Sequence, residues 1–297
     1  MDFETTLGVP VTFWHEIAQV EPPENKGSQK EWDNPLIDVM HNELLNSGSE
    51  DDRASLLAAA AKNSGAWLDA LPVSALGNLL DDDSLRISVG LPVGADLCEE
   101  HQCRCGRIVD NKGIHGLSCK YSAGRHTRHG TINDIIQKAL CTAGLQAVRE
   151  PSGLNRGDGK RPDGMTRVPW SQGKALIWDV TVVDTLARSH LALTSKNAGA
   201  AADKPEETKR TKYASLLDRY IFAPIGLETL GSWGNEGTAL VEEIGRKLAR
   251  NSREPRSTLF LIQRISVALQ RGNASSVMGT FQFSKGLEEL FYVLRSS

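Results

Sequence analysis

The sequence predicts an α/β fold in which helices flank a mixed sheet, with a helical N-terminal region and a small cysteine-rich knuckle in front of it. Three observations support this prediction. Apolar residues recur at helical spacing after about residue 30, four cysteines cluster between positions 98 and 119, and a helix, three strands, a helix and a further strand then follow in that order. A chain of 297 residues is long enough to bury a sizeable core.

Four regions follow one another along the chain. An irregular lead-in ends in PPENKGSQK, which is a poor core former. The next region is mainly helical, because Leu36, Met40 and Leu44 are spaced for one amphipathic face. The knuckle and the α/β domain come after it. The predicted boundaries are residues 1–30 for the lead-in, 31–95 for the helical region, 96–123 for the knuckle and 124–297 for the α/β domain.

The α/β domain begins with a helix. Ile132, Ile136 and Leu140 form its apolar face, the stretch from Thr131 to Asp134 resembles a capping box, and a glycine closes it. A Gly-rich turn, PSGLNRGDGK, separates the first two strands. Strands are predicted around residues 146–150, 161–168, 175–183 and 221–230, and further helices at 206–219, 236–250 and 257–271.

The charges are divided unevenly along the chain. Residues 1–100 hold 5 Lys and Arg against 19 Asp and Glu, a net charge of −14, and residues 101–297 hold 29 against 18, or +11. This split indicates contact with nucleic acid through the basic part, although two solvated faces of one protein would give the same counts. The sequence lacks both the roughly 18 apolar residues that cross a bilayer and a signal-peptide pattern, so we expect an intracellular protein without a membrane partner.

The cysteine cluster predicts a structural zinc site. Disulfides are rare inside cells, so close thiols there indicate metal binding. A tetrahedral Zn²⁺ needs four nitrogen or sulfur donors, which tight turns can supply without a large core. Cys98 or His101 could replace one member of the preferred set, and reduced cysteines without metal are the alternative. The preferred ligands are Cys103, Cys105, His115 and Cys119.

An aspartate interrupts a strand that is otherwise predicted to be buried on both faces. Asp179 lies in the apolar run 175–183, where an unpartnered carboxylate would cost several kcal/mol. If the strand that holds Asp163 is its antiparallel neighbour, the two aspartates meet at one end of the sheet. Two carboxylates fit Mg²⁺ or Mn²⁺, with Glu150 as a third oxygen ligand or a residue that orients water. The alternatives are that Asp179 ends a strand or forms an ordinary ion pair with Arg161 or Lys174.

The pair Pro162-Asp163, the second acid Asp179 and the order of elements resemble the restriction-like endonuclease, or PD-(D/E)XK, superfamily. The closer resemblance is to the C-terminal endonuclease region of non-LTR retrotransposon polyproteins. There a Cys/His zinc knuckle precedes a segment similar to Gly124-Arg125 and Arg128-His129, and the two acids follow. The resemblance covers about residues 95–230. The helical region before it resembles the linker that follows the polymerase in such polyproteins.

The chain departs from the superfamily pattern at one position. The pattern has a lysine two residues after the second acid, and Thr181 stands there in this sequence. In the retroelement branch a lysine from the following helix takes its place, which implies Lys212 here, with Lys209 as the second choice. Such a lysine would activate the attacking water or stabilise charge on the phosphate. A solvated helix face is the alternative for both lysines.

Basic residues near the knuckle predict contact with phosphate. Six Lys and Arg lie against one Asp between positions 101 and 130, and we expect Arg125, Arg128 and His129 to contact DNA, with a place near the acids or in a solvated loop as the alternatives. The sequence shows no polymerase signature, and the run from Asp81 to Asp83 predicts a loop or a helix cap. The chain should therefore not copy nucleic acid by itself.

The resemblance implies a metal-dependent endonuclease that nicks duplex DNA at a retroelement target site. Asp163 and Asp179 would hold Mg²⁺ or Mn²⁺, Lys212 would assist, and Glu150 would be an auxiliary acid, while Zn²⁺ would be structural. The expected partners are DNA, with RNA as a second nucleic acid, and the polymerase part of a retroelement polyprotein, in the nucleus. The alternative is an inactive, zinc-containing nucleic-acid-binding module left from a retroelement.

Overall fold

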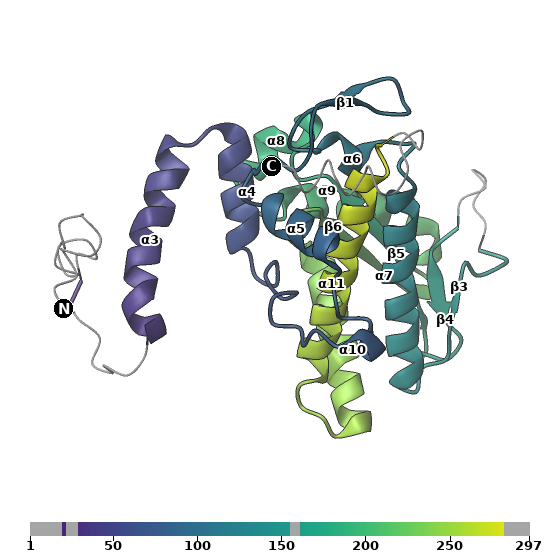
Figure 1. Ribbon diagram of the computed structural model, residues 1–297. Helices are drawn as coiled ribbons and strands as arrows, with labels where there is room; N and C mark the ends of the chain where they lie inside the picture. The colour runs from purple at the N-terminus through teal and green to yellow at the C-terminus, as the bar shows by residue number, and fades with distance from the viewer. Residues whose placement is uncertain (1–19, 22–28, 155–160, 282–297) are drawn as a thin grey trace, which may run out of the picture.

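The computed structural model describes residues 20–21, 29–154 and 161–281 of the 297-residue chain. The predicted lead-in, residues 1–30, therefore lies almost entirely outside the described residues, as does the end of the turn PSGLNRGDGK. The described chain is an α/β structure in which helices surround a four-stranded mixed sheet (Figure 1).

The strands of the sheet lie side by side in sequence order. β4 pairs antiparallel with β3 and with β5, whereas β5 and β6 run parallel along their whole length. The predicted mixed sheet is confirmed, and the strand that follows Asp163 is the antiparallel neighbour of the strand that holds Asp179, which was the condition for the two acids to meet. The strands are β3 (Ala147–Arg149), β4 (Gly164–Thr166), β5 (Ala175–Val183) and β6 (Tyr220–Glu228).

Helices cover both faces of the sheet. α7, α10 and α11 pack together against Leu176 and Trp178 on one face, in the largest apolar cluster. Ile177 and Phe222 point to the other face, where they pack against Tyr213 at the end of α9. None of the helices in the described ranges has the length and apolar character needed to cross a membrane. The helices are α7 (Ala123–Thr142), α8 (Arg188–Thr194), α9 (Ala200–Lys212), α10 (Asn235–Ser252) and α11 (Ser257–Met278), with the 3₁₀ turn η2 (Ala214–Leu216) after α9.

The N-terminal region is helical, as the sequence predicted. The first helix of the described residues, α3, has no buried residue and stands apart from the body of the molecule, whereas α4 packs against α8 (Figure 1). Asp81 caps α5, because its carboxylate accepts the backbone N–H of Ser84 at 2.9 Å. The elements are α3 (Gln29–Ser47), α4 (Glu50–Ala60), the 3₁₀ turn η1 (Ser74–Leu76) and α5 (Asp82–Gly90).

The knuckle is a small hairpin followed by a single helical turn, at one end of the molecule (Figure 1). Strands β1 (His101–Gln102) and β2 (Ile108–Val109) pair antiparallel, and the short helix α6 (His115–Ser118) leads directly toward α7. α6 packs against the end of α11. The knuckle is therefore attached to α7 and α11, which are two of the helices that cover the sheet.

Two helix predictions need correction. α7 begins at Ala123, so the stretch from Thr131 to Asp134 lies inside the helix and is not a capping box. The helix predicted at 206–219 lies earlier, at residues 200–212, and α8 precedes it without having been predicted. In both places the helix includes small or polar residues and is stabilised by tertiary packing. Helix propensity alone therefore underestimates how far these helices extend.

Candidate metal centre and carboxylate site

Four side chains of the knuckle converge on one point. Cys103 and Cys105 lie between β1 and β2, and His115 and Cys119 lie at the two ends of α6. All four ligand atoms lie within 4.8 Å of one another. The Sγ atoms of Cys103 and Cys119 are 3.7 Å apart, near the edge of about 3.8 Å in a tetrahedron with zinc–sulfur bonds of about 2.3 Å. This Cys₃His cluster is the preferred set that the sequence predicted, and it could hold a structural zinc ion.

The protonation of these side chains also suits a metal ion. Burial raises the pKa of the Cys103 thiol to about 11, so this thiol keeps its proton unless a cation displaces it. The backbone N–H of Arg107 lowers the pKa of Cys105. Burial lowers the pKa of His115 and so favours the neutral imidazole, which is the form that binds metals. Zn²⁺ would release the thiol protons on binding.

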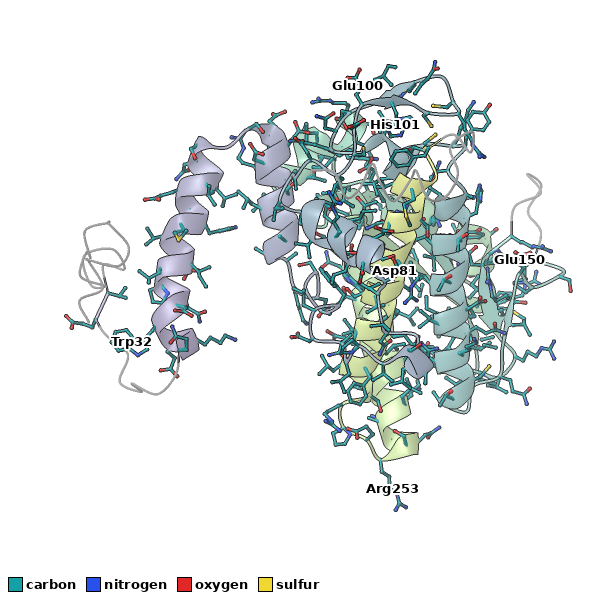
Figure 2. The ribbon with its side chains drawn as sticks, viewed as in Figure 1. Trp32, Asp81, Glu100, His101, Glu150 and Arg253 are labelled. Carbon is teal, nitrogen blue, oxygen red and sulfur yellow. The ribbon has the colours of Figure 1, made fainter. Side chains whose placement is uncertain are left out.

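The two proposed replacements lie outside the cluster. The Cys98 thiol donates a weak hydrogen bond to the carbonyl oxygen of Asp110 at 3.4 Å, and burial raises its pKa to about 11. The ring of His101, labelled in Figure 2, stacks on Phe281 at 4.1 Å, and its Nε2 lies 2.8 Å from the hydroxyl of Thr280. Cys98 therefore contacts the backbone of the knuckle at Asp110, and His101 attaches the knuckle to the end of the described chain at Thr280 and Phe281.

The hairpin brings the two predicted acids together. Gly164 of β4 pairs with Trp178 of β5, and Asp163 and Asp179 are the next residues on the two chains beyond this pair. Their carboxyl groups lie within hydrogen-bonding distance of each other. The side chains are only 16% and 10% exposed, respectively. The carboxylates form a largely buried cross-strand pair.

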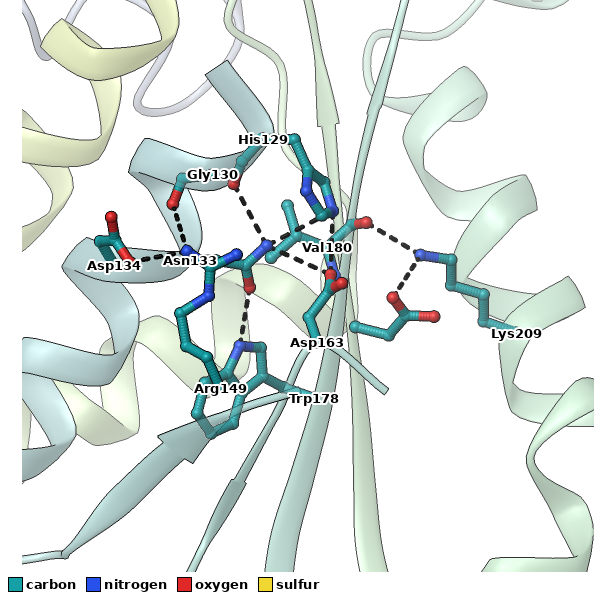
Figure 3. Close-up of polar contacts among 10 residues, drawn as sticks. His129, Gly130, Asn133, Asp134, Arg149, Asp163, Trp178, Val180 and Lys209 are labelled. Atoms are coloured by element: carbon teal, nitrogen blue, oxygen red, sulfur yellow. Dashed lines mark hydrogen bonds and ion pairs between the residues drawn. The ribbon is translucent and has the colours of Figure 1, made fainter. Parts of the chain in front are cut away.

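Three donors hold the carboxylate of Asp163, and all of them end on its Oδ2 atom (Figure 3). His129 Nε2 on α7 donates at 3.0 Å, and Asn133 Nδ2, one turn further along α7, donates at 3.2 Å. The backbone N–H of Val180 donates at 2.7 Å. The first helix of the domain and the central strand thus fix the position of this carboxylate.

The residues next to the acids support this arrangement. The indole N–H of Trp178 donates to Oδ1 of Asn133 at 2.9 Å and so orients the amide that contacts Asp163 (Figure 3). Gly164 makes room for that indole, since a Cβ atom at this position would lie 2.0 Å from Cζ2 of Trp178. A glycine is therefore required directly after Asp163, because any side chain there would displace Trp178.

A lysine from α9 completes the site. Lys209 Nζ lies 3.1 Å from Oδ1 of Asp179 and also donates to the carbonyl oxygen of Val180 at 2.9 Å. The peptide groups of Val180 therefore contact both halves of the site, through the N–H to Asp163 and through the C=O to Lys209 (Figure 3). The second choice from the sequence, Lys209, is the lysine in contact with the acids.

The two carboxyl groups have opposite pKa shifts. Burial raises the pKa of Asp179 to about 6, and the nearby carboxylate of Asp163 adds to this effect while Lys209 opposes it. Burial also disfavours ionisation of Asp163, but the hydrogen bond and charge of His129 and the N–H of Val180 outweigh it and lower the pKa to about 2. The same hydrogen bond raises the pKa of His129. Asp163 is thus ionised at neutral pH, whereas Asp179 loses its proton at a pH close to neutrality.

Two other predicted site residues point elsewhere. Lys212 is half-buried, with its ammonium group 5.4 Å from the centre of the Tyr213 ring. Glu150, labelled near the outer edge of the sheet in Figure 2, is exposed and forms an ion pair with Arg161. Only the backbone of Glu150 touches the site, through its N–H to the carbonyl oxygen of Asp163 at 2.8 Å.

The three residues expected to contact DNA have three different environments. Arg128 is only 2% exposed, and it donates to Oδ1 of Asn273 and to the carbonyl oxygen of Leu117. It is a structural arginine in the core, and the prediction of a DNA contact is wrong for it. Arg125 remains near the surface, whereas His129 binds Asp163 as described above.

Sequence reasoning missed Asn133 altogether and assigned His129 to another role. These residues are four apart on α7 and so lie on the same helix face. Their helical spacing was a usable signal, but the capping-box interpretation placed His129 before the helix.

A scan against models of known protein families and a search of curated proteins found no match to this chain. The chain is an α/β protein with a mixed four-stranded sheet, a Cys₃His cluster and a buried carboxylate pair in contact with a lysine.

Asp163 and Asp179 could hold a divalent metal ion such as Mg²⁺ or Mn²⁺. Mg²⁺ prefers one or two protein carboxylates and fills its other positions with water and phosphate oxygens. Asp163 and Asp179 offer two such groups, and the buried hydroxyl of Thr181, on the same strand, makes no hydrogen bond within the described part of the chain.

Proposed function

We propose that this protein is a metal-dependent endonuclease that hydrolyses phosphodiester bonds and nicks duplex DNA. The observation that carries the proposal is the opposed pair Asp163 and Asp179 with Lys209 in contact with Asp179. Hydrolysis of a phosphodiester needs a metal site to hold and polarise the phosphate, and a positive group where charge develops. Two buried carboxylates and one ammonium group meet both needs.

The resemblance noted from the sequence supports the same proposal. The order α7, β3, β4, β5, α9, β6, with Pro162-Asp163 at the second strand and a Cys₃His cluster in front, resembles the endonuclease region of non-LTR retrotransposon polyproteins. We propose that origin for this chain, with action on nuclear DNA and a polymerase part of the same polyprotein as a partner. Lys209 takes the role that the sequence first suggested for Lys212.

Each side chain has a distinct task in the proposed reaction. A bound Mg²⁺ or Mn²⁺ would supply Lewis acidity and lower the pKa of a water molecule. Asp163 and Asp179 would hold this ion. His129 and Asn133 keep the Asp163 carboxylate in place. Lys209 is positioned beside Asp179 to donate to a phosphate oxygen or to the attacking water.

The rival assignment is a nucleic-acid-binding module without catalysis. The 3.1 Å contact between Lys209 and Asp179 favours it to some extent, because an ion pair can neutralise a buried acid without any metal. Zinc content and salt-sensitive DNA binding are expected from both assignments. Only cleavage separates them.

The test is nicking of supercoiled plasmid by the purified protein, with added Mg²⁺, with added Mn²⁺ and without either. Asp163→Ala serves as the inactive variant, and its zinc content and DNA affinity are measured beside its activity. We expect metal-dependent nicking that Asp163→Ala abolishes while both other properties persist. A parent protein that binds DNA and never cuts it would establish the binding module instead.

A further inference from the structure

One ammonium group contacts two parts of the carboxylate site at once. Lys209 Nζ lies 3.1 Å from Oδ1 of Asp179 and 2.9 Å from the carbonyl oxygen of Val180 (Figure 3). The side chains of Lys209 and Asp179 are only 18% and 10% exposed, so water and salt screen this ion pair weakly. A divalent ion that binds the carboxylate of Asp179 must therefore compete with a cation that the protein itself supplies.

The same face of β5 carries a hydroxyl group without a hydrogen-bond partner. Oγ1 of Thr181 is buried and makes no hydrogen bond within the described residues. Successive side chains of a strand point to opposite faces, so Thr181 lies on the same face as Asp179, about 7 Å further along the strand. A buried hydroxyl without a partner is costly, and a nearby cation is one group that can satisfy it.

Helix α9 covers this face of the sheet. Thr181 is the register partner of Gly226 on β6, where a Cβ atom would lie 3.1 Å from Cγ of Glu206 on α9. Lys209 lies three residues after Glu206 on the same helix. The carbonyl group of Val180, which Lys209 contacts, belongs to the peptide bond that leads to Thr181. A small shift of the ammonium group along β5 would therefore bring it from the carboxylate to the hydroxyl.

We propose that Lys209 has two positions, one paired with Asp179 and one on the hydroxyl of Thr181, and that a divalent ion at Asp179 moves it from the first to the second. This inference deepens the proposed function, since it rests on the assignment of Asp179 as a metal ligand. Lys209 keeps its proton in both positions, and the carbonyl oxygen of Val180 accepts from it in both. Thr181 is thus a positioning residue, which acts on the site through the lysine.

Competition of this kind makes the measured affinity for the ion weaker than the intrinsic affinity of the carboxylates. Only molecules in which the lysine has left Asp179 can bind, and the apparent Kd is the intrinsic Kd divided by their fraction. If Lys209 holds Asp179 in about nine molecules of ten, loss of the lysine tightens binding about tenfold. Loss of the Thr181 hydroxyl has the opposite effect, because it removes the acceptor that the displaced lysine uses. This second effect requires the lysine to be present.

The test measures Mn²⁺ binding by calorimetry without DNA, so it needs no cleavage. The measurement is made at pH 8, so that Asp179 is ionised even where the lysine that lowers its pKa is missing. The proteins are the parent, Lys209→Met, Thr181→Val, Thr181→Ser and the double variant of Lys209→Met with Thr181→Val. Lys212→Met is the control for loss of a positive charge from α9. Ser266→Ala removes another buried hydroxyl that has no partner in the described residues, on α11 at the opposite face of the sheet.

We expect Lys209→Met to bind Mn²⁺ about tenfold more tightly than the parent and Thr181→Val to bind it about fivefold more weakly. Thr181→Ser, Lys212→Met and Ser266→Ala should bind like the parent. In the double variant the cost of Thr181→Val should vanish, so that its affinity equals that of Lys209→Met. Should Lys209→Met fail to fold, as judged by circular dichroism, Lys209→Gln replaces it, since glutamine removes the charge and keeps a polar end.

Three results would overturn the proposal. The first is a Lys209→Met variant that binds Mn²⁺ no better than the parent, and the second is a parent that binds no Mn²⁺. The third is a loss from Thr181→Val that persists in the double variant, because the hydroxyl would then act on the ion without the lysine.

The outcome is separate from the test of the nuclease. A parent that shows the expected affinities and never cuts plasmid would refute the nuclease and leave the two positions of Lys209 valid. Plasmid nicking by a parent whose Lys209→Met variant gains no affinity would refute the two positions and leave the nuclease intact.

Discussion

At the scale of single residues, the proposed function depends on how the fold gives two aspartates different environments. Asp163 receives three hydrogen bonds on one oxygen, and its pKa falls to about 2. Asp179 is buried beside that negative charge, and its pKa rises to about 6. Asp163 is thus held ionised, whereas Asp179 would lose its proton when a metal ion binds to it.

The raised pKa of Asp179 predicts a pH dependence of metal binding. A metal ion binds the ionised carboxylate, so the affinity for Mn²⁺ without DNA should rise as the pH increases through about 6 and level off above it. An unshifted carboxyl group would instead complete this rise near its ordinary pKa of 3.8. Calorimetric titration with Mn²⁺ between pH 5 and pH 8 measures the effect. An affinity that does not change over this range would contradict the assignment of Asp179 as a ligand.

His129 should act through Asp163. Its loss in His129→Ala removes one hydrogen bond and one source of positive charge from the carboxylate, so we expect Mg²⁺ to bind roughly 10–100-fold more weakly. The metal concentration for half-maximal nicking measures this change, and excess Mg²⁺ should restore much of the rate. His126→Ala, an exposed histidine on the same helix, is the control and should behave like the parent.

At the scale of elements, the crossover from β5 to β6 places Lys209, and a buried carboxylate fixes the crossover. Glu206 lies on α9 one turn before Lys209 and accepts three backbone N–H groups, from Gly226 of β6 at 2.7 Å and from Glu236 and Gly237 of α10 at 2.9 Å each. It thereby caps α10 from a neighbouring helix and ties α9 to the sheet.

Glu206→Ala should therefore destabilise the protein strongly. Three N–H groups, two of them in buried hydrogen bonds, would lose their acceptor, and we expect a loss of about 3 kcal/mol or more in the free energy of unfolding. Urea denaturation followed by circular dichroism measures it. Glu207→Ala changes the exposed neighbour on α9 and should cost less than about 0.5 kcal/mol. Similar values for the two variants would contradict this role of Glu206.

The bounds of the elements also show which parts of the fold sequence patterns can predict. β5 was predicted at both of its ends, because a near-continuous apolar run bounded by turns has few alternatives. The start of α7 was missed because its first turns, GRHTRH, are polar at the sequence level. They form a helix because Gly124 packs against the backbone of Ser276, where a Cβ atom would lie 2.3 Å from its nitrogen, and because Arg128 is buried.

The sequence predicted the two aspartates of the candidate site, but it did not predict which lysine contacts them. Asp163 and Asp179 followed from a Pro-Asp pair and a misplaced acid in a buried strand. The choice between Lys209 and Lys212 did not, since the two lysines are only three positions apart on α9 and only the rotation of α9 against β5 decides which ammonium group reaches Asp179. The register of α9 is fixed by the tertiary hydrogen bonds of Glu206, which no local pattern shows.

At the scale of the whole molecule, the knuckle and the helix that contacts Asp163 both pack against α11. Gly116 of α6 and Gly124 of α7 both pack closely on Ser276 of α11, and the hydroxyl of Ser122 donates to the carbonyl oxygen of Ser276 at 3.0 Å. Loosening the Cys₃His cluster should therefore weaken the packing of α7, which carries His129 and Asn133.

Removal of zinc should lower the stability of the α/β domain and not only that of the knuckle. We expect Cys103→Ser to lose its zinc and to unfold on the order of 5–10 °C below the parent. Metal analysis and differential scanning calorimetry measure these changes. Cys141→Ser alters an exposed cysteine outside the cluster and should retain both zinc and Tm. A zinc-free parent with unchanged Tm would contradict a structural role for the metal.

The central claim is that Asp163, Asp179 and Lys209 form one metal-dependent cleavage centre. The most direct test is the rate of plasmid nicking in saturating Mg²⁺ by the parent, Asp179→Ala, Lys209→Ala and Lys212→Ala, with Asp134→Ala as an exposed-acid control. We predict that Asp179→Ala and Lys209→Ala lose at least about 100-fold in rate, while Lys212→Ala and Asp134→Ala stay within a few-fold of the parent. Full activity of Lys209→Ala, or equal losses for both lysine variants, would contradict the site as described.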